Sequence, residues 1–221
     1  MGSDVALSWS GGKDSALTLA ELTAAGMAVR ALLVTDTGGQ VTMHGVPIEL
    51  VQRQADALGL PLYRVRLPAE ASNTTYESAM AGAITTLGEA GISRLAFGDV
   101  HLAEVRAYRE RRLSGLGAEL LFPLWHRNTG ELMRTLLARR HRAVVACVDL
   151  QQLDASFCGR QVDERFLAEL PNGVDPAGEH GEYHTFVTDG PDFAEPVPVR
   201  LGPCVTHEGR FRYQTLEAAP G

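Results

Sequence analysis

The stretch Val5-Ala6-Leu7-Ser8-Trp9-Ser10-Gly11-Gly12-Lys13-Asp14-Ser15 decides how this chain folds. Its first three residues are an apolar run typical of a buried strand, and residues 16–25 have the composition of a helix. Gly11 and Gly12 allow a sharp turn and a close approach of the backbone to a ligand. The helix start adds backbone N–H groups and a positive dipole end, which favour an anion. The sequence therefore predicts a strand, a glycine turn and a helix around a phosphate site.

Lys13 is the only lysine of the chain; the other 19 of the 20 lysine and arginine residues are arginines. A compact ammonium group in a glycine turn suits a phosphate, although a single lysine could also fall there by chance. The turn is not a Walker A loop, since Leu7 stands where that motif has its first glycine and Asp14 where it has Ser or Thr. The expected nucleotide contacts come from this turn and from two later strand ends: Ser8, Ser10, Gly11, Gly12, Lys13, Asp14, Ser15, Thr35 and Gly98.

Composition limits the function. The chain has 221 residues and a formal net charge of −7, which disfavours a broad nucleic-acid partner. No apolar run reaches the ~18 residues of a membrane span, and no secretory leader is present. The three cysteines, Cys147, Cys158 and Cys204, are predicted to be buried thiols of a reducing compartment. We expect a cytoplasmic protein without a membrane segment; a homodimer is compatible with the sequence.

Strand and helix patterns alternate through residues 1–125. Strands are expected at residues 5–7, 29–35, 62–67, 94–97 and 119–122, and helices at 16–25, 46–58, 75–90 and 103–116. This alternation predicts an α/β fold: a five-stranded parallel sheet with helices on both faces. Ligands of such sheets bind at the carboxyl ends of the strands. The polar stretches 8–15, 35–44 and 98–101 all follow strands, so we expect them to form one site.

The pattern changes after residue 125. Helices are expected at residues 129–140 and 161–170, and strands at 143–148, 182–188, 197–201, 204–207 and 210–215. The sequence predicts a smaller α+β domain at residues 126–221, after the α/β domain of residues 1–125; the family resemblance given below implies that the first binds the nucleotide and the second the substrate.

Four residues of the first domain are further candidates. Asp99 follows a strand end and is either a catalytic or metal-binding carboxylate or a helix N-cap. Arg106 and Arg109 share a helix face and could bind a substrate carboxylate or phosphate, or form a solvated face paired with glutamates. His44 follows a turn near the proposed site and is either a substrate contact or a surface histidine.

Residues 179–185 form the densest polar cluster of the second half, Glu179-His180-Gly181-Glu182-Tyr183-His184-Thr185. On a strand, Glu182 and His184 face the same side and could contact the acyl substrate or transfer a proton. Glu179 and Thr185 are further substrate contacts. A metal site at His180, Glu182 and His184 lacks the His-Glu-x-x-His spacing, and a structural polar hairpin is the remaining alternative.

These motifs form a wider pattern. Residues 10–15, Ser-Gly-Gly-Lys-Asp-Ser, match the PP-loop of the N-type ATP pyrophosphatases. Over residues 5 to 200 the chain resembles the diphthine–ammonia ligase family, on the segments Met43-His44-Gly45-Val46, Gly98-Asp99-Val100, Val105-Arg106-Ala107-Tyr108-Arg109-Glu110-Arg111, Phe122-Pro123-Leu124-Trp125 and Asp175-Pro176-Ala177-Gly178-Glu179-His180-Gly181-Glu182-Tyr183-His184-Thr185-Phe186.

The resemblance implies an adenine nucleotide α-hydrolase fold and a ligase that cleaves ATP to AMP and pyrophosphate. A substrate carboxylate would be activated as an adenylate and captured by ammonia, with Mg²⁺ at Asp99. The implied catalytic residues are Lys13, Asp99, Glu182 and His184. His180 departs from the family pattern, and the arginine- and alanine-rich usage suggests a bacterial genome, so the carboxylate is left open. The alternatives are a PP-loop enzyme that transfers sulfur or an amine to tRNA, and a non-catalytic ATP-binding module.

Overall fold

The computed structural model describes residues 4–42 and 44–219, and their contacts divide the chain into two compact units. The first unit holds the described residues up to Ser10, together with Asp14–Thr42 and Leu60–His126. The second holds Gly11–Lys13, residues 44–59 and the chain from Arg127 onward. The helix at residues 48–58 and three turn residues thus group with the second half, although their positions in the sequence lie in the first.

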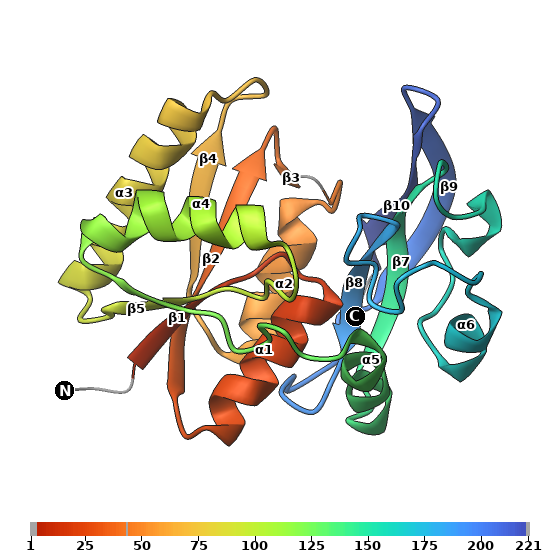
Figure 1. The fold of residues 1–221 in the computed structure, drawn as a ribbon, viewed down its shortest axis with the longest axis horizontal. Helices are drawn as coiled ribbons and strands as arrows, with labels where there is room; N and C mark the ends of the chain where they lie inside the picture. The colour runs from red at the N-terminus through yellow and green to blue at the C-terminus, as the bar shows by residue number, and fades with distance from the viewer. Residues whose placement is uncertain (1–3, 43, 220–221) are drawn as a thin grey trace. The chain divides into compact units, whose positions relative to one another are not determined.

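The first unit is built on a parallel sheet (Figure 1). Its strands are Asp4–Ser8 (β1), Ala28–Thr37 (β2), Gln40–Val41 (β3), Leu62–Leu67 (β4), Arg94–Ala96 (β5) and Glu119–Leu121 (β6). Five of them are parallel in the order β4-β2-β1-β5-β6, so the predicted α/β class and five-stranded sheet are confirmed. The short β3 is an addition: Gly38 and Gly39, both at positive φ, turn the chain back so that β3 pairs antiparallel with β2.

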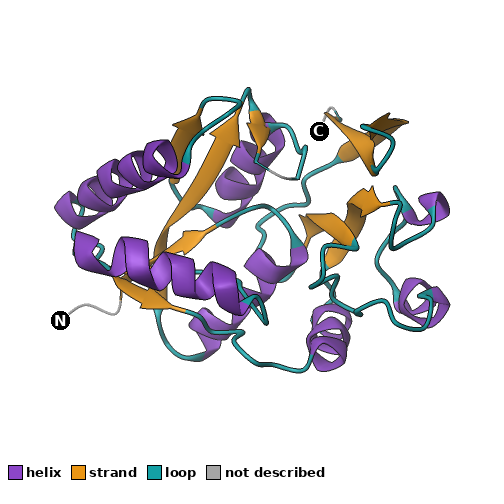
Figure 2. Ribbon diagram, turned by 45° about the horizontal axis from the view of Figure 1, so that its top comes forward, coloured by secondary structure: helices purple, strands orange, loops and turns teal. Residues whose placement is uncertain are grey.

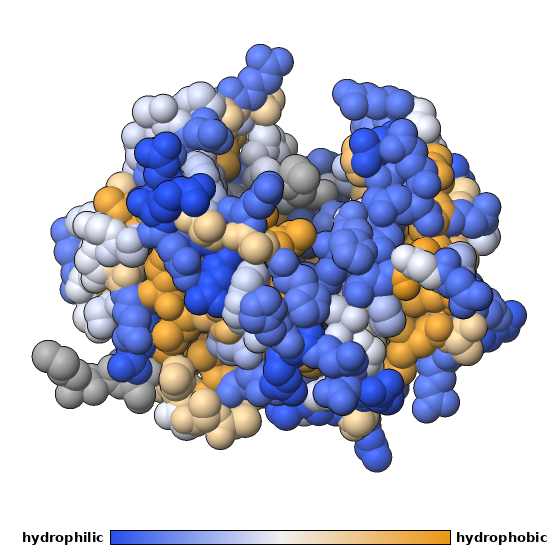
Figure 3. Space-filling view, viewed as in Figure 1, coloured by the Kyte–Doolittle hydropathy of each residue, from blue (hydrophilic) through white to orange (hydrophobic). Residues whose placement is uncertain are grey.

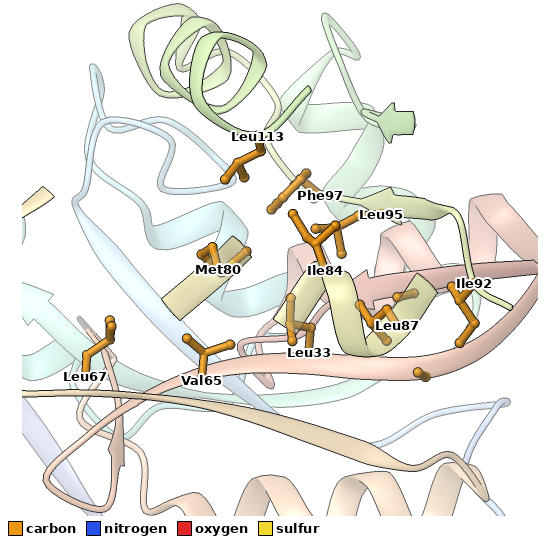
Figure 4. Close-up of a cluster of buried hydrophobic side chains, with 12 residues drawn as sticks. Leu33, Val65, Leu67, Met80, Ile84, Leu87, Ile92, Leu95, Phe97 and Leu113 are labelled. Carbon is orange, nitrogen blue, oxygen red and sulfur yellow. The ribbon is translucent and has the colours of Figure 1, made fainter. Parts of the chain in front are cut away.

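Helices of the first unit cover both faces of this sheet. They are Lys13–Ala24 (α1), Asn73–Glu89 (α3) and Ala103–Leu113 (α4), the last followed by the 3₁₀ turn Ser114–Leu116 (η1). The α1 crossover runs from β1 to β2, whereas the α3 crossover runs back from β4 to β5. Because such crossovers are right-handed, α1 and α3 lie on opposite faces. Figure 4 shows the core under α3 and α4, where Met80 and Ile84 of α3 meet Leu33 and Leu95 of the sheet.

The second unit is built on an antiparallel sheet in the order β8-β7-β10-β9. Its strands are Arg142–Asp149 (β7), Tyr183–Asp189 (β8), Val199–His207 (β9) and Phe211–Ala218 (β10), and its helices are Ile48–Leu58 (α2), Thr129–Ala138 (α5), Ala155–Phe157 (η2, 3₁₀) and Glu164–Glu169 (α6). Long loops connect β7 to β8 and carry only short helical turns (Figure 2).

Of the differences between the expected and the observed elements, three are informative. The expected strands 197–201 and 204–207 are one strand, β9. Helix α6 is shorter than the expected 161–170, because Asp163 caps it by accepting a hydrogen bond from Phe166 N at 2.7 Å. Helix α1 begins at Lys13, three residues before the apolar pattern starts, so Lys13 lies in its first turn.

An ion pair joins the buried carboxylate of Asp149, at the end of β7, to the half-exposed Arg210 just before β10. Asp149 is 1% exposed and accepts a hydrogen bond from Arg210 Nη2 at 2.7 Å. The hydrogen bonds from Arg210 lower the pKa of Asp149 to about 2. The charged carboxylate is therefore favoured in the folded protein.

We expect Asp149→Asn to lower the free energy of unfolding at pH 7 by about 2 kcal/mol, since one pKa unit corresponds to about 1.4 kcal/mol. A depressed pKa stabilises the fold above the unfolded value of about 4 and ceases to do so as pH falls through the folded value. The difference between variant and wild type should shrink from about pH 5 to pH 2 in urea unfolding. Asp4→Asn, which removes an exposed pair with Arg30, is the control. A difference that does not change with pH would contradict this linkage.

The surface carries few large apolar side chains. Figure 3 shows apolar residues in separate places on a predominantly hydrophilic face. Within the described ranges, the exposed large hydrophobic residues are Leu102, Leu201 and Val205. None of the helices in that part of the chain is long and apolar enough to cross a bilayer.

Candidate nucleotide site

The first unit has a topological switch point at β1. Strand β2 pairs with one side of β1 and β5 with the other, so the loops that follow β1 and β5 diverge there. This is the place where open α/β sheets bind ligands. Ser8 ends β1, and Gly98 and Asp99 follow β5. A Cβ on Gly98 would lie 3.2 Å from the carbonyl oxygen of Asp14, so the two loops touch and only glycine fits without displacement.

Hydrogen bonds across the turn fix its first-unit residues. Ser10 N donates to Ser15 Oγ at 3.0 Å, and the two hydroxyl oxygens lie 3.2 Å apart. Thr18 Oγ1 donates to the carbonyl oxygen of Asp14 at 2.6 Å. The hydroxyl groups of Ser10 and Ser15 therefore lie together at the turn, where the sequence predicted them.

The turn residues of the second unit are held by the edge of β8. The carbonyl oxygen of Gly11 accepts a hydrogen bond from Val187 N at 2.8 Å, and Lys13 N donates to Thr185 Oγ1 at 3.0 Å. The hydroxyl of Thr185 thus accepts a hydrogen bond from the glycine turn, and the expected contact of Thr185 with the substrate stays a prediction. Two main-chain groups of the turn are thus fixed by one strand.

Gln54 of α2 is a residue that the sequence reasoning missed. Its side chain is fully buried, and Nε2 donates to the carbonyl oxygens of Gly11 at 3.0 Å and Val187 at 2.6 Å. Gly11 has φ +80°, and a Cβ there would lie 2.7 Å from Gln54 Oε1. The available signal was an amide on the apolar face of α2, between the buried Val51 and Ala55. Gln54 therefore clamps the turn to β8.

Lys13 is buried in this arrangement. It is 3% exposed, and Nζ lies 5.4 Å from the centroid of the Tyr183 ring. The aromatic face attracts a cation and excludes water around it. A charged group in such surroundings interacts more strongly with an anion than it would in water.

His44 and His184 form a ring pair in the second unit, with centroids 4.6 Å apart and planes tilted by 40°. Burial, then the neighbouring His184 and Lys13, lower the pKa of His44 well below its usual range. His44 is therefore neutral at pH 7. Met43, the first residue of the motif that contains His44, lies outside the described residues.

Asp99 and Arg109 pair within the first unit, with Oδ2 and Nε 3.0 Å apart, and the Arg109 guanidinium lies 4.1 Å from the Phe97 ring centroid. Burial raises the pKa of Asp99, as does Asp14, against the opposing effect of Arg109. Arg106 pairs with Glu110 at 2.8 Å, and its guanidinium lies over the rings of Phe122 and Trp125. A substrate contact of Arg106 stays a prediction. The two arginines thus have different partners.

Glu182 has a local structural task. Its two carboxylate oxygens accept hydrogen bonds from Asp175 N and His180 N, both at 2.8 Å, and the residue is 2% exposed. The backbone N–H of Glu179 donates to Asp175 Oδ1 at 3.3 Å, in the same loop. A catalytic role for Glu182 stays a prediction, but its carboxylate orders the loop before β8.

We expect Glu182→Ala to lower the free energy of unfolding by about 2–4 kcal/mol, because it removes the buried charged acceptor of two backbone N–H groups. Urea denaturation measures the loss. Glu195→Ala, at an exposed position, is the control and should change stability by less than about 0.5 kcal/mol. Equal stability of the two variants would show that the loop does not depend on this carboxylate.

Two of the expected contacts and the expected metal have weaker support. Ser8 and Thr35 lie in β1 and β2, and the Thr35 carbonyl accepts a hydrogen bond from Thr42 N at 3.2 Å. Among the residues placed in the structure, no group of three or more His, Cys, Asp or Glu side chains could hold a metal ion. Asp99 stays the predicted carboxylate ligand of the metal ion.

The switch point and the Ser-Gly-Gly-Lys-Asp-Ser turn between β1 and α1 define the class: a Rossmann-like α/β protein with a PP-loop. Residues 3–119 match the model of the diphthamide synthase N-terminal domain, and residues 128–213 match that of the diphthamide synthase C-terminal domain. The chain belongs to the diphthamide synthase family, and the resemblance derived from the sequence is confirmed.

Curated relatives agree with this family. The diphthine–ammonia ligases of Bos taurus and Homo sapiens are each 27% identical to the chain over 222 residues, which cover 90% of this chain and 83% of each relative. Among solved structures, the U34-tRNA thiolase NcsA of Methanococcus maripaludis is similar with a TM-score of 0.38 and 16% identity, over 61% of this chain and 55% of that one.

Proposed function

We propose that the protein is an ATP-dependent ligase that forms AMP and pyrophosphate. It activates a substrate carboxylate as an acyl adenylate and transfers ammonia to it, as the name of its relatives, the diphthine–ammonia ligases, suggests. A carboxylate is a poor electrophile, and adenylation gives it a good leaving group. Diphthine is the first substrate to test.

The turn at residues 10–15 carries the proposal. It follows β1 at the switch point, begins α1 and holds the single lysine of the chain in a buried position. The helix start and Lys13 would stabilise the negative charge that develops on the departing pyrophosphate. We assign the nucleotide contacts to strand ends and the turn: Ser8, Ser10, Gly11, Gly12, Lys13, Asp14, Ser15, Thr35 and Gly98.

We also propose residues that contact the substrate. Arg106 and Arg109 are assigned to the substrate in the first unit. In the second unit the assigned residues are His44, Glu179, Glu182, His184 and Thr185. We also keep residues 1–125 as the nucleotide domain and 126–221 as the substrate domain, which the matched ranges 3–119 and 128–213 support.

Mg²⁺ is proposed to accompany ATP. This ion needs only one or two protein carboxylates when phosphates supply its other ligands. Asp99 follows β5, the strand beside the switch point at β1. Asp14 is near enough to raise the pKa of Asp99, so a cation here would relieve the repulsion between the two carboxylates. Arg109 already neutralises part of this charge. The residues therefore fit an ion held mainly by phosphate.

Chromatography of the nucleotide products tests the reaction type. The protein is incubated with ATP, Mg²⁺, ammonium chloride and a diphthine-bearing protein. AMP and pyrophosphate, formed only when the carboxylate is present, are the expected products. ADP and phosphate would contradict the assignment, and bound but uncleaved ATP would favour a non-catalytic module.

A further inference from the structure

His44 has an unexplained atom in the second unit. Its Nδ1 is buried, and no group in the described part of the chain forms a hydrogen bond with it. An unsatisfied buried polar atom costs free energy, so a ligand that supplies the missing partner would be favoured there. The ring lies against His184, with centroids 4.6 Å apart. A Cβ on Gly45 would lie 2.6 Å from the Tyr213 ring, so the turn at Gly45 packs directly on β10.

The charges around His44 restrict the kind of ligand. Lys13 is near enough to lower the pKa of His44, and burial and His184 act in the same direction. Tyr213, with a pKa raised to about 12, contributes no charge at neutral pH. A neutral imidazole protonated at Nε2 presents a lone pair at Nδ1, which attracts an N–H donor and repels a carboxylate. Lys13 in turn disfavours a cationic donor. A small, neutral N–H donor is the ligand that satisfies both conditions.

We propose that His44 binds the ammonia nucleophile and accepts its proton at Nδ1 during amide formation. This inference rests on the proposed function, because ammonia is a substrate only if the protein is an ammonia ligase. His184 is the positioning residue that holds the ring through stacking. The presence of Lys13 gives the site a further property: it would bind ammonia in its neutral, nucleophilic form in preference to ammonium.

The step is balanced without a further reactant. The nitrogen lone pair attacks the acyl carbon of the adenylate, a C–N bond forms and the bond from carbon to the phosphate oxygen breaks. The electron pair leaves with AMP, and one proton passes from the nitrogen to His44 Nδ1. The imidazolium beside Lys13 is disfavoured, so it releases the proton to solvent, and the ring is neutral for the next cycle.

Nuclear magnetic resonance on the whole protein tests the binding without any acyl substrate. Protein with ¹⁵N-labelled histidine is titrated with ammonium chloride at pH 8–9, where a fraction is ammonia, and His44→Phe assigns the signal. The expected result is a saturable shift of the His44 Nδ1 resonance, which grows with pH as the ammonia fraction grows. Potassium chloride is the control, because K⁺ resembles ammonium in size. An equal shift with potassium, or none with ammonia, would overturn the proposal.

Kinetics separate this proposal from the proposed function. His44→Phe keeps a ring for His184 but removes the nitrogen. It should lower carboxylate-dependent AMP formation with hydroxylamine, a stronger nucleophile that traps the adenylate, much less than it lowers the reaction with ammonia. It should lower ammonia-dependent amide formation ~10²-fold or more, the range for losing a general base. His207→Phe, which changes a ring 5.3 Å from Tyr213, is the matched control. Equal losses with both nucleophiles would overturn the role of His44, whereas a wild type that forms no AMP would contradict the proposed function itself.

Discussion

Lys13→Ala is expected to lower AMP formation by ~10²-fold or more, the range for removing one group that stabilises a developing oxyanion. A contact between an ammonium and a phosphate contributes about 1.5–3 kcal/mol to binding, and more if it strengthens in the transition state. Lys13 is buried, lies over Tyr183 and begins α1, so neither bulk water nor another lysine can replace it. Lys13→Arg keeps the charge but not its compact shape and should restore only part of the activity.

The single lysine allows a direct measurement of the contact. An adenosine polyphosphate with a pyridoxal aldehyde at its phosphate end, which reacts with amines, should label one side chain of the wild type, and excess ATP should protect it. The N-terminal amine is the other reactive group and gives a distinguishable peptide. Urea unfolding of Lys13→Ala checks that the fold is intact. A folded variant that turns over ATP at the wild-type rate would refute the PP-loop assignment.

The parallel α/β class of the first unit was predictable from the sequence because its elements are local and strongly periodic. Helix α1 was expected too late, since apolar periodicity cannot detect a polar first turn such as Lys13-Asp14-Ser15. Strand β9 was expected as two strands because Gly202 and Pro203 are typical breakers. The structure accommodates Pro203 because β9 is the edge of its sheet and its register with β10 shifts opposite Pro203, between Gln214 and Leu216.

The candidate site was partly predictable for a different reason. Glycines, hydroxyls and the lysine of the turn are contiguous, so their spacing alone indicated a phosphate site. Gln54 was missed because its partners, Gly11 and Val187, are 43 and 133 residues away and a single amide has no motif. The structural role of Glu182 was missed because a sequence does not show that the backbone N–H groups of Asp175 and His180 donate to its carboxylate.

Gly11→Ala is expected to reduce AMP formation ~10²-fold or more, because a displacement of about 1 Å at a positioned group can have that effect. Two costs combine at this position. Its φ of +80° is unfavourable for alanine, and the new Cβ would lie 2.7 Å from Gln54 Oε1. The Gln54 amide is fully buried and donates to Gly11 and Val187, so it can move away only by losing those hydrogen bonds. The turn would shift instead, and the backbone that leads into Lys13 would move with it.

Gly39→Ala is the matched control, because Gly39 has φ +84° but a Cβ there would meet no atom within 4 Å. It should lose about 1 kcal/mol of stability from backbone strain and keep its AMP formation. Gln54→Ala removes the clash but also the clamp, so the double variant should be less impaired than the sum of the two single changes in activation free energy. Wild-type AMP formation by Gly11→Ala would mean that the turn does not need the conformation in which β8 and Gln54 hold it. A loss of the same size in Gly39→Ala would mean that strain alone, and not the position of the turn, limits the enzyme.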